Sequence, residues 1–156
     1  MREHKNKRRR FEMVGRQRWA VYGASLALWL SGAVWVMAHF FWHSEGAFGP
    51  MVHPAEPWSM KVHGAALLVL ALVLGALWPV HIKPAWRSGH NRRSGLGLGL
   101  GVGFLTLTGY LLYYGPGDAP REWIALTHWA FGLGAPLLLW LHIWLGRRSR
   151  RCQTTA

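Results

Sequence analysis

The sequence predicts an all-α integral membrane protein, a four-helix bundle with both termini in the cytoplasm. Two observations carry this prediction. Four largely apolar segments each exceed about 18 residues, the length needed to cross a bilayer. Of the 18 lysines and arginines, all but Lys61 and Arg121 lie in the two terminal segments and one connecting loop. Four spans place these three regions on one side, which the positive-inside rule makes the cytoplasm.

The spans follow one another without a second domain. A basic arm (1–18) precedes a transmembrane domain (19–146), and a basic tail (147–156) follows it. The apolar run of the first span is too long for a signal peptide, and three prolines separate it from the second. Alternating glycines favour close packing of the third span or, as the alternative, the close approach of a flat cofactor, and Pro136 is expected to kink the fourth. The predicted spans are 18–42, 58–82, 95–114 and 121–146.

Composition excludes several classes of function. Cys152 is the only cysteine, so the chain has no intrachain disulfide, no attachment motif for c-type haem and no ligand set for an iron–sulfur cluster. The formal charge of +12 is not accompanied by a nucleic-acid recognition motif. We therefore expect the basic ends to contact anionic headgroups of membrane lipid and not nucleic acid.

Four histidines lie inside the spans, at two depths. His63 and His128 lie near the outer ends of the second and fourth spans, and His81 and His142 lie near the inner ends of the same helices. Fourteen residues bring His128 and His142 within about 40° on one helix face, and eighteen residues bring His63 and His81 onto one face. Because ionisable groups inside a membrane usually mark a functional site, we expect two cross-helix pairs, His63 with His128 and His81 with His142.

Imidazoles that face each other across a bundle are suited to holding haem iron from both sides. Gly132 and Ala135 lie between the two histidines of the fourth span and leave a shallow groove for a flat cofactor. Haem propionates need cationic or hydrogen-bond-donating partners near the interfaces. The candidates are Lys61 and Arg121 on the outer side and Arg87, Arg92, Arg93 and Arg147 on the inner side. The two outer residues fit equally well as interfacial side chains that snorkel to water.

The spacing of the histidines differs between the two helices. Eighteen residues rise by about 27 Å and fourteen by about 21 Å. Helix tilt, a bend at Pro79 or a frayed helix end must absorb this difference. Otherwise His39 or His43, at the outer end of the first span, supplies the outer ligand.

Three other interpretations stay open. In the simplest interpretation, each histidine only forms a hydrogen bond to a neighbouring helix. A histidine relay would suit a proton or ion transporter, although Glu122 is the one acidic residue close to a span. A haem-binding or haem-free structural or assembly subunit of a larger complex is the third. A bare zinc or copper ion is disfavoured, because sulfur ligands and a compact three-ligand cluster are absent from the pattern.

The chain also resembles a known family, the small bacterial four-helix b-type cytochromes of the cytochrome b561-like kind. It is most similar to short cytochromes that serve extracytoplasmic flavin-carrying proteins. The resemblance lies in KVHGAALLVL (61–70), PVHIKPAWRSGHNRRSG (79–95), TGYLLYYG (108–115) and the LTHW and LHIWLG pieces of the fourth span.

The resemblance implies an electron-transfer protein or oxidoreductase subunit of the bacterial inner membrane, with two non-covalent b-type haems. Its partners would be a quinone or other donor and an extracytoplasmic redox protein. It assigns axial ligation to His128 and His142. The chain departs from the family in one respect, because its second span is expected to supply both remaining ligands. A quinone site is expected near His90 and Asn91, and the outer partner is expected to dock on 44–58 and 115–120. Whether the chain acts alone, as an oligomer or in a complex is left open.

Overall fold

The structure, a computed structural model, describes residues 15–42, 44–46, 49–89, 91–115 and 117–152. Its helices fill almost all of this length. His43, His90 and residues 1–14 of the basic arm lie outside the described residues. The elements in chain order are α2 (Gly15–Phe41), β1 (Ser44–Gly46), β2 (Gly49–Met51), α3 (Ala55–Leu77), η1 (Trp78–Ile82), α4 (Lys83–Ser88), α5 (Arg92–Tyr114) and α6 (Asp118–Cys152).

The prediction of four membrane-spanning helices is confirmed in the part of the chain that the structure describes. Four helical stretches are long and apolar enough to cross a bilayer. They are Gly15–Phe41, Ala55–Ser88, Arg92–Tyr114 and Pro120–Ser149. The chain is therefore an all-α, multi-pass membrane protein.

The helices extend beyond six of the predicted span boundaries. The second helical stretch begins at Ala55 and not at 58, with Pro57 in its first turn, where a missing N–H has little cost. It also continues as α4 through basic residues that were predicted as loop, and α6 continues into the predicted tail. The physical reason is that apolar sequence marks the hydrocarbon boundary, whereas lysine and arginine favour helix and let it continue into the polar interface.

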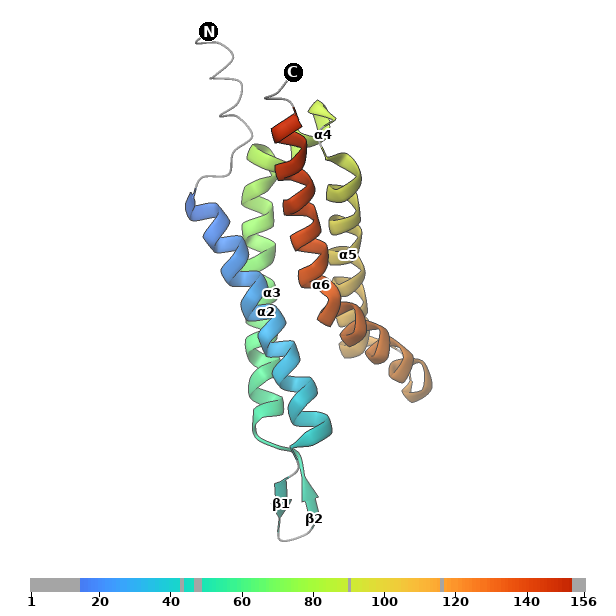
Figure 1. Cartoon of the computed structure of the whole chain (residues 1–156). Helices are drawn as coiled ribbons and strands as arrows, with labels where there is room; N and C mark the ends of the chain where they lie inside the picture. Colours follow the sequence, from blue (N-terminus) through green and yellow to red (C-terminus); the bar gives the residue numbers. More distant parts are fainter. Residues whose placement is uncertain (1–14, 43, 47–48, 90, 116, 153–156) are drawn as a thin grey trace.

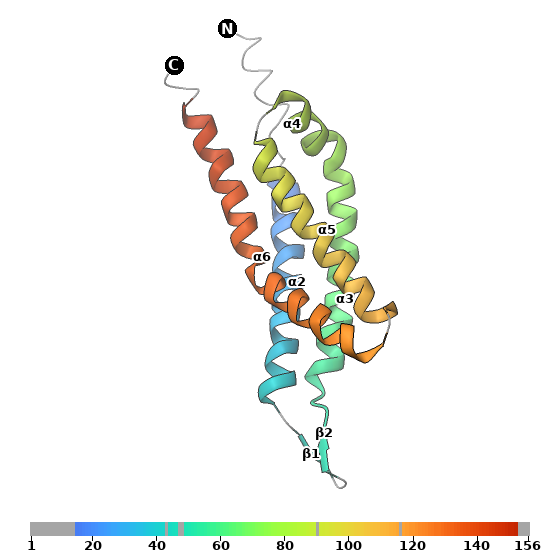
Figure 2. The same cartoon turned by 90° about the vertical axis from the view of Figure 1, so that its right-hand side faces the viewer.

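The bundle consists of two helical hairpins. α2 packs against α3, α5 packs against α6, and the two hairpins meet chiefly through α2 and α6. α3 and α6 therefore each pack on α2 more than on one another. Figures 1 and 2 show the helices running side by side, with β1 and β2 projecting as a small antiparallel hairpin beyond one end. In both views α6 bends about midway, in the region of Pro136, whose ring removes one helical hydrogen bond.

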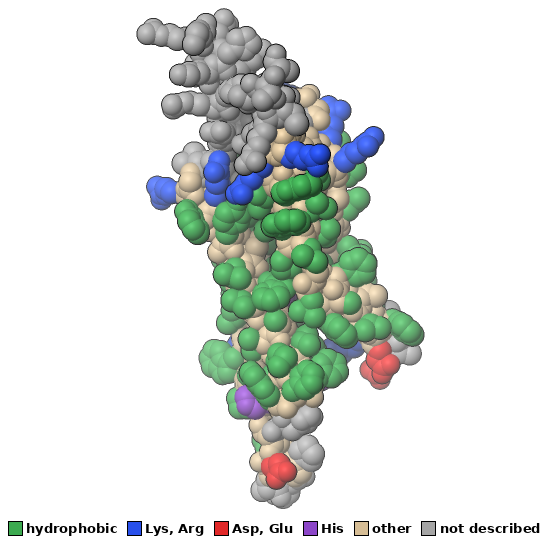
Figure 3. Space-filling model, in the orientation of Figure 1, with side chains coloured by type: hydrophobic (Ala, Val, Ile, Leu, Met, Phe, Trp, Pro, Cys, Tyr) green, Lys and Arg blue, Asp and Glu red, His purple; other side chains and the backbone are tan. Residues whose placement is uncertain are grey.

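Charge separates the two ends of the bundle. The first residue of α2 and the last turns of α6 lie at the same end as α4, and Lys and Arg side chains gather there (Figures 1 and 3). We call this the arginine-rich end, and the opposite end, which carries β1 and β2, the hairpin end. The acidic side chains that the structure describes lie at the hairpin end: Glu45, Glu56, Asp118 and Glu122. The bundle thus has the charge asymmetry that membrane proteins show across a bilayer.

The interior is narrow and lined by small side chains. Ala24, Ala38, Ala66 and Ser31 are among the buried residues, and no large side chain is fully buried among the described residues. Large apolar side chains cover the outside instead (Figure 3), including Leu72 at 75% exposure. An exposed apolar surface of this extent is stable only against lipid, and close approach of small residues is how helices pack in that medium.

Candidate functional site

His63 projects from α3 toward α2. Its Nδ1 lies 3.1 Å from Ser31 Oγ, and the Ser31 hydroxyl donates its only hydrogen to Leu28 O at 2.9 Å. Because that hydrogen is already used, we assign the proton of the second contact to His63 Nδ1, which then donates to Ser31 Oγ. This tautomer leaves Nε2 with a free lone pair, the state that ligates a metal.

His128 on α6 is held in the same way by α5. Its Nδ1 lies 2.9 Å from Thr108 Oγ1, and the Thr108 hydroxyl donates to Phe104 O at 2.9 Å and to Leu105 O at 3.2 Å. Thr108 is 6% exposed, so this bond is shielded from solvent. Because the Thr108 hydroxyl hydrogen is already donated to the backbone, the proton of the His128 contact is assigned to Nδ1. The lone pair of His128 is then on Nε2.

His142, two to three turns from the other end of α6, has a third copy of this arrangement. Its Nδ1 lies 3.1 Å from Ser94 Oγ on α5, and the Ser94 hydroxyl contacts Asn91 O at 3.2 Å. Three histidines of the predicted set of four are therefore oriented through Nδ1 by a hydroxyl on the neighbouring helix. Such a bond fixes both the tautomer and the ring direction of a ligating histidine.

A glycine follows each of these hydroxyl residues, and the imidazole lies against it. A Cβ on Gly32 would be 3.3 Å from His63 Cε1, one on Gly109 would be 3.2 Å from His128 Cε1, and one on Gly95 would be 3.7 Å from His142 Cε1. We call each Ser–Gly or Thr–Gly dipeptide with its histidine a hydroxyl–glycine pair. The hydroxyl orients the ring and the glycine lets it approach the helix backbone.

The hydroxyl–glycine pairs were missed by reasoning from the sequence, which assigned the glycines to helix packing or a flat cofactor. The signal is present in the sequence, at Ser31–Gly32, Ser94–Gly95 and Thr108–Gly109. It is not specific, because Ser88–Gly89 has the same form and instead ends α4, with Gly89 in the left-handed conformation at φ 76°. Only the packing of the helices distinguishes the two uses.

The two outer histidines face each other from α3 and α6. The ring centroids of His63 and His128 are 6.3 Å apart, with an interplanar angle of 69°. The predicted outer pair is thus brought together by the fold, although α3 packs chiefly on α2 and α6 packs chiefly on α5. His63, and not His39, is the histidine whose ring lies against His128.

The inner pair is built differently. His81 lies in η1, a π-helical turn that begins beside Pro79. Proline lacks the N–H that an α-helix would use here, and a wider turn accommodates it. The departure from regular geometry expected at Pro79 therefore takes the form of a π-helical turn, which has less rise per residue and shortens the distance from His63. His81 lies near enough to His142 for their charges to interact.

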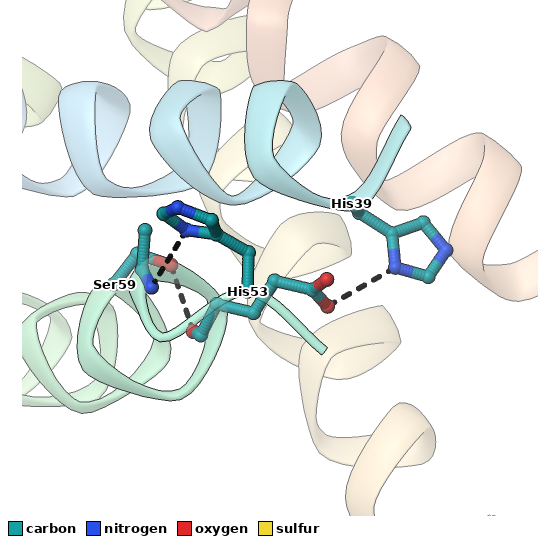
Figure 4. Close-up of polar contacts among 5 residues, drawn as sticks. His39, His53 and Ser59 are labelled. Carbon is teal, nitrogen blue, oxygen red and sulfur yellow. Dashed lines mark hydrogen bonds and ion pairs between the residues drawn. The ribbon is translucent and has the colours of Figure 1, made fainter. Parts of the chain in front are cut away.

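His39 is engaged at the surface of the hairpin end. Its Nδ1 lies 3.1 Å from Glu56 Oε2, its side chain is 47% exposed, and its ring stacks on Trp35 at 4.7 Å. Figure 4 shows this contact beside two others that order the start of α3. His53 Nδ1 accepts a hydrogen bond from the Ala55 N–H, and the Ser59 hydroxyl donates to Glu56 O. His39 thus ties α2 to α3, while the alternative ligand His43 lies outside the described residues.

The predicted cationic partners occupy both ends. Lys61 Nζ lies 4.5 Å from the Trp58 ring centroid, and Arg121 is exposed at the start of α6. At the arginine-rich end, Arg87 and Arg147 are exposed, whereas Arg92 and Arg93 line a cavity between α5 and α6. Gly132 and Ala135 are half-buried on α6, and a Cβ on Gly132 would meet Leu105 at 3.9 Å.

A bare metal ion in a protein usually has three or four side-chain ligands close together. Among the described residues, no three histidine, cysteine, aspartate or glutamate side chains cluster as the ligands of a bare metal ion would. Comparison with known proteins found no family model, curated protein or solved structure that matches the chain.

Proposed function

We propose that this chain is a di-haem b-type membrane cytochrome that passes electrons across the membrane, one haem near each face. The observation that carries the proposal is the His63–His128 pair. Two imidazoles on different helices face each other, and the hydroxyl that bonds each Nδ1 leaves Nε2 as the ligating nitrogen. A histidine with a purely structural role needs no such matched partner.

The spacing of the rings fits the proposal. A metal–imidazole bond is about 2.0 Å, and each ring centroid lies about 1.1 Å beyond its nitrogen, so two imidazoles on opposite sides of one metal have centroids about 6 Å apart. The observed separation is 6.3 Å. The angle between the rings is no obstacle, since rings on a common axis are able to rotate about it. Each ring lies close against a glycine of the neighbouring helix, Gly32 for His63 and Gly109 for His128, where a larger side chain would displace the ring.

When bound, haem would supply one-electron redox chemistry that no side chain of this protein provides. The protein's part is to hold and tune it. His63 with His128 and His81 with His142 would hold the two haems, and Ser31, Thr108 and Ser94 fix three of these imidazole rings. Lys61 and Arg121 are the outer partners for propionates, and Arg87 and Arg147 are the inner ones. Gly132 and Ala135 have small side chains, which leaves a shallow groove on α6 between His128 and His142 for a flat cofactor.

The charge asymmetry supports an orientation for this activity. The arginine-rich end would face the cytoplasm of a bacterial cell, and the hairpin end would face outward. A quinone or other donor would then act at the arginine-rich end. An extracytoplasmic redox protein that carries flavin would dock on β1, β2 and the turn before α6.

An absorption spectrum of the purified protein, oxidised and then reduced with dithionite, tests the proposal. The expected result is a Soret band with a sharp α band on reduction, and about two haems per chain. Protein from haem-sufficient cells that shows neither band would overturn it. A spectrum with haem but no change on reduction would also contradict an electron-transfer role.

A further inference from the structure

Two adjoining hollows lie between the start of α5 and the end of α6 at the arginine-rich end. The first is a cavity of about 660 Å³ lined by Arg92, Arg93, Arg148, Asn91, Ser94 and Ser149. The second is a groove of about 270 Å³ that runs toward His142 between Gly97, Leu98, Leu138 and Leu141. Arg93, Ser94 and Leu145 line both, so a cavity that has three arginines in its lining adjoins an apolar groove.

Two of the three arginines are held in place by tryptophans. Arg92 Nε donates to Trp86 O at 2.6 Å, and its guanidinium carbon lies 5.8 Å from the Trp86 ring centroid. The Arg148 guanidinium lies 5.5 Å from the Trp144 ring centroid. Stacking of this kind positions a guanidinium while leaving its Nη donors available. The cavity therefore presents ordered cationic donors.

The backbone adds further donors. α5 starts at Arg92 after Asn91, which has φ 50° and gives no side-chain cap. The first N–H groups of a helix lack an acceptor within the helix and favour an anion. No described acidic residue lies at this end to neutralise the arginines, since all of them are at the hairpin end. A multiply hydrogen-bonded anion is the group that this cavity complements.

We propose that these hollows form a binding site for one anionic phospholipid. Its phosphate lies among Arg92, Arg93 and Arg148, and one acyl chain lies in the groove beside Leu138 and Leu141. A free phosphate would occupy the cavity alone and would leave the apolar groove empty. A membrane phospholipid would occupy both, with its phosphate in the cavity and an acyl chain in the groove. This lipid site goes beyond electron transfer, and it adjoins the proposed inner haem site, because His142 and Ser94 also line the groove.

The site is tested on the full chain, purified in mild detergent, by native mass spectrometry with added dioleoyl phosphatidylglycerol. Dioleoyl phosphatidylcholine and inorganic phosphate are the comparison probes. We expect wild type to retain one phosphatidylglycerol in preference to phosphatidylcholine, and Arg93→Gln with Arg148→Gln to lower its retention about tenfold or more. Arg16→Gln with Arg18→Gln removes the same charge from the same end, away from the cavity, and should retain the lipid.

A second pair of variants tests the groove. Gly97 lines it, and a Cβ there would meet nothing within 4 Å, so Gly97→Leu fills the groove without a backbone clash. Gly99 is equally open but does not line the groove, which makes Gly99→Leu the matched control. We expect Gly97→Leu to lose phosphatidylglycerol and Gly99→Leu to keep it.

Three results would overturn the proposal. Equal loss of lipid in the Arg16/Arg18 and Arg93/Arg148 variants would mean diffuse attraction to a basic surface. Full competition by inorganic phosphate, with no effect of Gly97→Leu, would mean a free-anion site. Loss of haem together with unchanged lipid in the Arg93/Arg148 variant would mean that these arginines hold a propionate.

Discussion

The outer and inner histidine pairs differ in how tightly the helices hold them. A Cβ on Gly32 or Gly109 would lie 3.3 or 3.2 Å from an outer histidine ring, closer than an ordinary van der Waals contact. At Gly95, beside inner His142, the distance would be 3.7 Å, which is ordinary contact. The outer rings approach each other from regular helices, whereas His81 lies in a π-helical turn. The hydroxyl–glycine pairs therefore restrict the position of the imidazole ring more tightly at the outer histidines than at His142.

Removing a ligand should have the largest effect. His128→Ala is expected to remove the outer haem and His142→Ala the inner one, about one haem per chain in each case. The double variant should bind none. Haem per chain, measured as the pyridine haemochrome, checks this. If both single variants kept two haems, the assignment of ligands to α6 would be wrong.

Adding one methyl group should separate the two pairs. Gly32→Ala and Gly109→Ala would force the outer rings to shift, at a cost of about 1–3 kcal/mol from overpacking, and should reduce outer haem content. Gly95→Ala should leave the inner haem in place. The control is Gly103→Ala on the same helix, where a Cβ would meet nothing within 4 Å. Equal haem loss at Gly95 and Gly109 would contradict the difference drawn between the pairs.

Removing a hydroxyl should have a smaller, graded effect. Thr108→Val keeps the shape but deletes the acceptor for His128 Nδ1–H, and outer haem affinity should fall about 10- to 100-fold. Thr108→Ser should restore it, and Ser94→Ala should give the corresponding change at the inner pair. Haem transfer to apo-myoglobin provides the measurement. An unchanged transfer rate and redox potential in Thr108→Val would show that the hydroxyl does not orient the ring.

The smallest effect is expected at the surface pair of the hairpin end. Glu56→Gln weakens the contact to His39, and partly exposed ion pairs contribute about 0–1 kcal/mol. Thermal stability should fall slightly, with haem content unchanged. A loss of outer haem in His39→Ala, with retention in His63→Ala, would instead make His39 the outer ligand.

The sequence was sufficient for the number of helices and for the depth of each histidine. Apolar length determines the first, and counting along a helix determines the second. The sequence did not predict that α3 begins at Ala55 or that α6 ends at Cys152. Hydropathy marks the boundary of the membrane, whereas the backbone hydrogen bonds of a helix continue past that boundary.

The sequence also did not reveal which side chains contact each histidine. Which hydroxyl meets His63 depends on how α2 and α3 rotate against each other, and Ser31 lies 32 residues away in the chain. Arg148, which joins Arg92 and Arg93 at the cavity, was likewise not among the expected partners, because its approach depends on the helical continuation of α6 past residue 146. Contacts of this kind come from packing and have no local signature.

In the proposed cytochrome, His63 and His128 together ligate one haem iron. Low-temperature electron paramagnetic resonance of the oxidised protein tests this ligation directly, because two imidazoles make ferric haem low-spin. We predict a wild-type spectrum that is entirely low-spin, and conversion of about half of it to high-spin, or its loss, in His63→Ala. An unchanged low-spin spectrum in His63→Ala would contradict the account.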